Sequence, residues 1–220
     1  MTSILKVDNI KDSANNQAIA ISSGNMTVAG NMTVAGNTTF TGTVTGDNNS
    51  LVKLSSSTVS NVTSVDFNSS LITDAYNTYK IIGTNVSPRS QSQNPFVLPS
   101  IDNGANFNLN TKNARFFSRL YSTATGGEYE ASSVSLMRIG TSLFNASDRG
   151  SEWDLTLYNL RSTTFWKHMT GFCIGALGSG DGYNWRSSGQ IETQSAVNFI
   201  RLKMASGNMD GKFTLYGVKE

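Results

Sequence analysis

Residues 151–160, SEWDLTLYNL, place apolar side chains at every second position. Trp153, Leu155 and Leu157 share one face of an extended chain, because successive strand side chains point to opposite sides. Asn159 continues this face, and polar residues fill most of the positions between. The period of two predicts a β-strand with one buried and one exposed face.

The same alternation returns near the end of the chain, in KFTLYGV (212–218), where Phe213, Leu215 and Gly217 share a face. Turn-forming stretches such as GSGDG (178–182) and SGNMDG (206–211) separate further apolar runs. These candidate strands lie at 63–72, 77–86, 94–101, 114–123, 131–140, 163–177 and 189–205. About nine strands and no convincing helix predict that residues 51–220 form an antiparallel, jelly-roll-like β-sandwich.

Residues 24–42, GNMTVAGNMTVAGNTTFTG, repeat a six-residue unit that glycine punctuates. Each unit reads as a short strand, and the apolar positions that keep register are Met26, Val28, Met32, Val34 and Phe40. So short a repeat needs neighbours to be stable, and other copies of the chain can supply them. We therefore predict that residues 24–50 form a shaft wound from several copies of the chain; a flexible linker is the alternative.

Residues 1–23 begin with an apolar group made of Ile4, Leu5, Val7 and Ile10. The segment is too short to have a core of its own, which predicts docking on a partner. The alternating Ile19 and Ile21 leave open that the segment merely begins the shaft. It lacks the apolar region and cleavage site of a secretory signal, so we expect an uncleaved chain made in the cytoplasm. No run approaches the roughly 18–20 apolar residues of a membrane span.

The composition argues against several classes of function. Charged residues make up 15% of the chain, the formal net charge is +2, and no cluster of Lys and Arg favours nucleic-acid binding. The single cysteine, Cys173, lies in an apolar run and is expected to fill core space. The single histidine, His168, has no metal-ligand spacing around it, so we expect neither a metal nor another cofactor.

Catalysis is not expected either. Two pairs of acidic residues lie two positions apart, Glu128 with Glu130 and Glu152 with Asp154. Each pair would point to one face of a strand, which is compatible with a glycan-cleaving site, but surface charges beside strands look the same. No serine lies in a G-x-S-x-G motif.

Ligand binding is the more plausible chemistry. A glycine-rich stretch at 178–189, expected to be a loop, carries aromatic, acidic, amide and basic side chains that suit a glycan or a protein surface. The candidates are Asp181, Tyr183, Asn184, Trp185 and Arg186, with Arg89 in the loop at 87–95 and Tyr129 in the turn at 124–130. Alternatively, Trp185 folds back over the edge of the sandwich as a lid.

Several stretches resemble the tail-fibre and capsid-fibre proteins of bacteriophages. The opening TSILKVDNIKDSANNQAIAISSGNMTVAGN resembles the start of such fibres, and NTYKIIGTNVSP, ARFFSRLYSTATGG, EYEASS and SAVNFIRLKMASGNMDGKFTLYGVK resemble their distal β domain. The resemblance implies a homotrimeric, non-enzymatic structural protein of the virion. Its N-terminus would dock on another virion protein, and its distal knob would bind a host-surface glycan or protein.

Two other classes of protein stay open. One is a carbohydrate-binding or adhesin module made by a bacterium, which the absent secretion signal disfavours. The other is a glycan depolymerase, which would need one of the acidic pairs to be catalytic. The sequence does not decide whether a fibre would sit on the capsid or on the tail.

Overall fold

The computed structural model describes residues 50–119, 125–132, 136–145, 150–176 and 182–219, with 117–119 and 125–132 described by their backbone. The strands are β1 (Leu51–Val62), β2 (Ser64–Phe67), β3 (Thr78–Pro88), β4 (Pro95–Ser100), β5 (Thr111–Arg119), β6 (Thr125–Ser132), β7 (Met137–Arg138), β8 (Ser151–Tyr158), β9 (Lys167–Ala176), β10 (Gly182–Ile191), β11 (Phe199–Met204) and β12 (Met209–Val218). This part of the chain contains no helix, which confirms the all-β prediction, and accordingly none that could cross a membrane.

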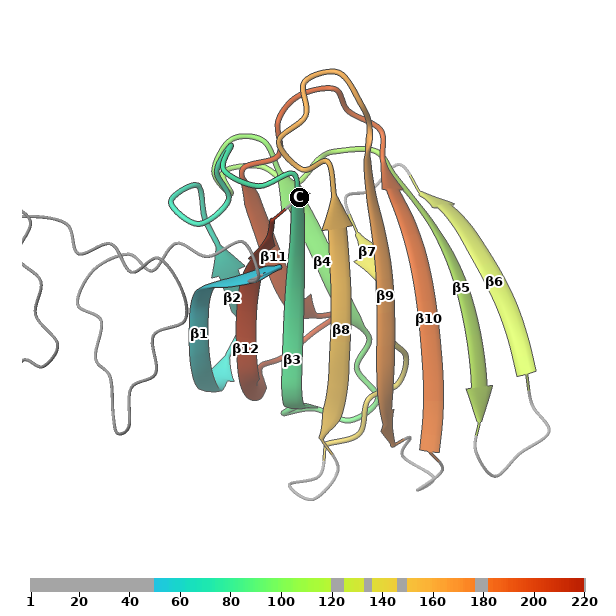
Figure 1. Ribbon diagram of the computed structural model, residues 1–220. Coiled ribbons are helices and arrows are strands. Elements are labelled where there is room, and N and C mark those ends of the chain that lie inside the picture. Colours follow the sequence, from blue (N-terminus) through green and yellow to red (C-terminus); the bar gives the residue numbers. More distant parts are fainter. Residues whose placement is uncertain (1–49, 120–124, 133–135, 146–149, 177–181, 220) are drawn as a thin grey trace, which may run out of the picture. The chain divides into compact units, whose positions relative to one another are not determined.

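The strands form two antiparallel sheets. The larger has eight strands in the order β1-β12-β3-β8-β9-β10-β5-β6, and the smaller has four in the order β2-β11-β4-β7. Figure 1 shows the larger sheet facing the viewer, with the smaller sheet behind it. Every strand pair is antiparallel.

The core lies between the sheets, where their inward-facing side chains meet. Along β8, Trp153, Leu155 and Leu157 are buried, and the residues between them are half-buried or exposed. Phe213 on β12 packs edge-on against Trp153, with ring centroids 5.6 Å apart. The small sheet adds buried residues such as Ile200 to the same apolar cluster. The predicted alternation of residues 151–158 is therefore confirmed.

Several predicted boundaries were wrong. The segment expected as one strand at 131–140 contains the end of β6 and the two-residue β7, and that at 189–205 contains the end of β10 and all of β11. β8 ends at Tyr158, so Asn159 does not continue its buried face; it adopts a φ of 57° in the turn that follows. β1 was not among the predicted strands, and β6 occupies most of the segment at 124–130 that was expected to be a turn.

Candidate functional site

The outer face of the large sheet carries a row of mostly small side chains that runs across five strands. The backbone register aligns Lys80, Thr156, Thr170, Ser188 and Ala114, one residue each from β3, β8, β9, β10 and β5. We call these residues the central row. Three of its members carry hydroxyl groups, so hydrogen-bonding groups are spaced across neighbouring strands.

Two rows of larger side chains flank the central row on the same face. The first flanking row consists of Ile82, Asp154, Phe172, Arg186 and Phe116. The second consists of Thr78, Tyr158, His168, Gln190 and Lys112. Residues two positions apart on a strand point to the same side, so all three rows face outward. The surface is hollowed where the central row meets the first flanking row, and we call this hollow the groove.

Two open depressions mark this groove. One has a volume of about 490 Å³ and is lined by Lys80, Asp154, Thr156, Thr170, Gly171, Phe172, Arg186 and Ser187. The other has a volume of about 250 Å³ and is lined by Ala114, Arg115, Phe116, Arg186, Ser187 and Ser188. Because Arg186 and Ser187 line both, the depressions adjoin at β10 and form one surface.

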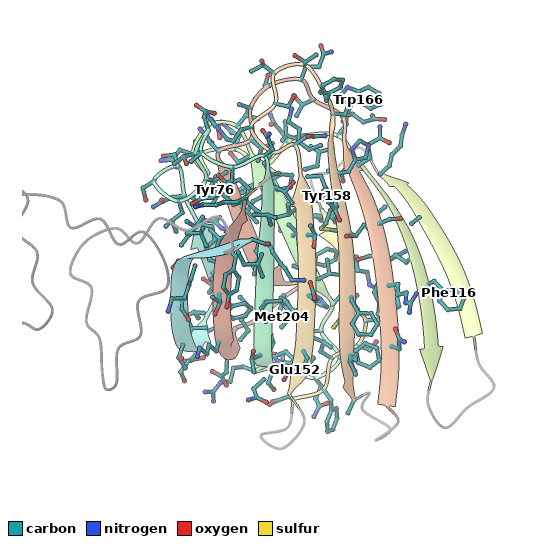
Figure 2. The ribbon with its side chains drawn as sticks, viewed as in Figure 1. Tyr76, Phe116, Glu152, Tyr158, Trp166 and Met204 are labelled. Atoms are coloured by element: carbon teal, nitrogen blue, oxygen red, sulfur yellow. The ribbon has the colours of Figure 1, made fainter. Side chains whose placement is uncertain are left out.

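The groove combines aromatic rings with charged and hydroxyl groups. Lys80 Nζ lies 2.8 Å from Asp154 Oδ2, so these two charges compensate each other. The Arg186 guanidinium lies over the Phe172 ring, with its carbon 5.9 Å from the ring centroid. Phe116 is 52% exposed and extends the apolar surface onto β5, as Figure 2 shows. Such a surface can pack against apolar C–H groups and hydrogen-bond to polar ones.

One hydroxyl contact links the central row to the second flanking row. Tyr158 Oη and Thr170 Oγ1 lie 3.4 Å apart, at the upper end of β8 in Figure 2. His168, in register with Tyr158, is exposed on β9.

The expectation that residues 178–189 form a loop was wrong, because β10 begins at Gly182. Asn184 and Arg186 face outward on this strand, but Tyr183 and Trp185 point into the core and are only 1% and 2% exposed. Neither buried ring offers a face to an external ligand. The position of Trp185 also excludes the lid alternative, since it lies within a central strand of the sheet.

The other predicted ligand-binding residues do not join the groove as a group. Arg89 forms an ion pair with Asp210, with Nε 2.7 Å from Oδ2. The backbone register places Tyr129 opposite Ala114, at the end of the central row. Asp181 lies outside the described residues.

The predicted virion-binding and shaft residues also lie outside the described part of the chain. They are Ile4, Leu5, Val7 and Ile10 for docking and Met26, Val28, Met32, Val34 and Phe40 for the shaft.

The β8–β9 connection carries a second exposed group, the aromatic residues Phe165 and Trp166, which are 65% and 44% exposed. The adjacent Lys167 is buried, and its Nζ donates to the carbonyl oxygens of Ser162, Phe165 and Thr193 at 2.6, 3.0 and 2.9 Å. Three carbonyl acceptors match the three donors of an ammonium group. The connection is therefore held in one conformation while it presents two aromatic rings to solvent.

The acidic pair Glu152 and Asp154 lies on the outer face, as predicted, but each carboxylate already has a partner. Glu152 Oε1 accepts the Asn85 N–H at 2.9 Å, and Asp154 pairs with Lys80. Among the described residues, no three His, Cys, Asp or Glu side chains are grouped so that they could hold a metal ion.

Sequence reasoning missed the central row. Thr156, Thr170 and Ser188 are ordinary strand residues, and only the pairing of β8, β9 and β10 brings them together. A hydroxyl residue at an outward position of three strands is the signal, but it is visible only once the register is known. Comparisons with protein-family models, curated proteins and solved structures find no match to this chain.

Proposed function

We propose that this protein is a structural component of a bacteriophage particle, a short homotrimeric fibre that attaches the virion to its host. Residues 1–23 dock on another virion protein, residues 24–50 wind into the shaft, and residues 51–220 form the distal, jelly-roll-like knob. In the shaft, Met26, Val28, Met32, Val34 and Phe40 face their counterparts in the other two chains.

The observation that carries the attachment role is the groove across β3, β8, β9, β10 and β5. Hydroxyl groups lie along its centre, and Phe172 and Phe116 lie in the flanking row. Rings of this kind stack on the C–H faces of sugars, and hydroxyls and charged groups hydrogen-bond to sugar hydroxyls. A host-surface glycan fits this chemistry, and the sequence resemblance to phage fibres supplies the setting.

The test is to label virions of the phage that encodes the chain with an antibody raised against residues 51–220. We expect electron microscopy to show antibody at the tips of virion appendages, and host cells to bind the purified full chain. Unlabelled virions, with the chain absent from their protein content, would refute the virion assignment.

A bacterial carbohydrate-binding module is the second candidate, because the same groove would serve it equally well. The antibody experiment distinguishes the two candidates, since the antibody labels virions only if the chain is a virion component. A glycan depolymerase is a weaker candidate, given the partners that Glu152 and Asp154 already have. It predicts that the protein lowers the viscosity of the host polysaccharide on incubation.

A further inference from the structure

Arg186 differs in its partners from the lysines on the same face of the sheet. On the same face, Lys80 pairs with Asp154, and Lys112 forms an ion pair with Glu192. Among the described residues, Arg186 has no carboxylate partner; its guanidinium lies over the Phe172 ring instead. The side chain is exposed and lines both depressions. The groove therefore presents an available positive charge at β10, where its two depressions adjoin.

A guanidinium group over an aromatic ring is well prepared to bind an anion. The parallel N–H groups of the planar guanidinium match the two oxygens of a carboxylate. The aromatic ring packs against the guanidinium without neutralising its charge. Thr170 and Ser188, adjacent in the central row, offer hydroxyl groups that both donate and accept. The groove thus combines an anion-binding group with groups that recognise hydroxyls.

The groove is also long. It crosses five strands, and at about 4.8 Å between neighbouring strands its length is about 19 Å. An extended oligomer fits such a groove better than a single small molecule does, and its repeating units would meet similar hydroxyl groups on successive strands.

We propose that the groove binds an acidic polysaccharide whose carboxylate groups pair with Arg186; this rests on the proposed function and specifies its receptor. The polymer lies across the strands, along the central row. Its hydroxyls hydrogen-bond to Thr156, Thr170 and Ser188, and the C–H faces of its sugars pack on Phe172 and Phe116.

The experiment measures binding of the full chain to immobilised polygalacturonate, alginate and hyaluronan at physiological ionic strength. Methyl-esterified polygalacturonate is the matched neutral polymer, since it keeps the sugar and removes the charge. We expect the carboxylate form of at least one polymer to bind and the esterified form to bind at least tenfold more weakly. Arg186→Gln should weaken binding about tenfold or more, as loss of a charge-assisted hydrogen bond does.

One further variant is a control, and another tests the hydroxyl groups of the central row. Lys212→Gln removes one positive charge from an exposed β12 position on the same face and should leave binding unchanged. Thr170→Val keeps the branched shape, removes one hydroxyl from the central row, and should weaken binding severalfold. The thermal unfolding of each variant, compared with that of the unmodified chain, shows whether it is folded.

Four results would overturn the proposal. They are no binding to any of the three acidic polymers, equal binding of the esterified polymer, equal losses in Arg186→Gln and Lys212→Gln, and a changed oligomeric mass for Arg186→Gln without a change in binding. The second points to a neutral glycan and the third to nonspecific attraction. The fourth identifies this face as a contact between copies of the chain. Virion labelling is independent of all four, so the acidic ligand can fail while the fibre assignment stands.

Discussion

At the scale of single residues, the position of Cys173 determines its reactivity. The side chain is fully buried on the inner face of β9, and its Sγ lies 3.2 Å from Tyr183 Oη. Burial raises the pKa of the thiol to about 12, so almost no thiolate is present near neutral pH. We expect the folded protein not to react with a disulfide reagent at pH 8, whereas the protein unfolded in guanidinium should react at one thiol per chain. Rapid reaction of the folded protein would contradict this.

The charge of Asp102 stabilises the turn after β4. Its carboxylate accepts the Ser100 hydroxyl at 2.6 Å, and the backbone and side-chain N–H groups of Asn106 at 2.9 and 2.6 Å. Hydrogen bonds from Ser100 and Asn106 lower the pKa of Asp102 from 3.8 to about 2. A carboxyl group whose pKa is lower in the folded state than in the unfolded state stabilises the fold at pH values above its unfolded-state pKa. This stabilisation is lost as the pH falls through the folded-state pKa.

The prediction for Asp102 concerns pH. Asp102→Asn should lower the melting temperature most at pH values above about 4, and the difference should shrink as pH falls toward about 2. Thermal unfolding of both proteins across this range measures the difference. A difference that is constant with pH would show that the charge of the carboxylate plays no part.

At the scale of elements, Lys167 fixes the connection between β8 and β9. Its ammonium group donates to the carbonyl oxygens of Ser162 and Phe165 in this connection and to that of Thr193 after β10. Lys167→Met keeps a side chain of similar length but leaves these carbonyl oxygens without the ammonium donor. We expect the free energy of unfolding in urea to fall by roughly 2–4 kcal/mol. Lys212→Met, on an exposed part of β12, should change it by less than about 0.5 kcal/mol. Similar values for the two would contradict the assigned role.

Gly217 on β12 is required by the aromatic ring that covers it. A Cβ at this position would lie 2.5 Å from the ring of Tyr76, which itself packs edge-on against Tyr79. Gly217→Ala should therefore lower the free energy of unfolding by about 1–3 kcal/mol. In a Tyr76→Leu background the same change should cost less, because the smaller side chain can move away. Additive effects in this double-mutant cycle would rule out a direct clash.

The sequence predicted the strands whose two faces differ most. β8 and β12 bury large apolar residues at alternate positions, so the period of two is plain. In β10 the inward positions after Tyr183 and Trp185 are Ser187 and Gly189, whose small size hides the same period. β1 is an edge strand without a buried residue, and four consecutive polar residues at 55–58 interrupt its few apolar ones.

The candidate site could be predicted only in part, for a related reason. Arg186 was identified from its chemistry, although its element was taken to be a loop. Its neighbours in the groove come from strands far apart in the sequence, such as Phe116 on β5 and Phe172 on β9. Only long-range strand pairing makes them adjacent, and periodicity within one segment carries no information about register between segments.

At the scale of the whole molecule, the decisive property is the number of chains. The repeat at 24–42 has few apolar residues and no disulfide partner, so a folded repeat would need other chains to be stable. We expect light scattering of the full chain to give three times the 23.7 kDa of one chain. A chain that starts at Ser50 keeps β1 and the Ser50 carbonyl that accepts the Lys219 N–H at 3.0 Å. That shorter chain should be folded and smaller than a trimer.

A second variant tests the shaft directly. Serine at Met26, Val28, Met32 and Val34 removes the apolar register and keeps the glycines and the length of the repeat. If this register holds the chains together, the variant should dissociate while its circular dichroism stays that of a β protein. A full chain that is monomeric would make the repeat a linker and favour the bacterial binding module. A serine variant or shorter chain that stays trimeric would instead assign assembly to the β-sandwich, because closed symmetry would then persist without the repeat.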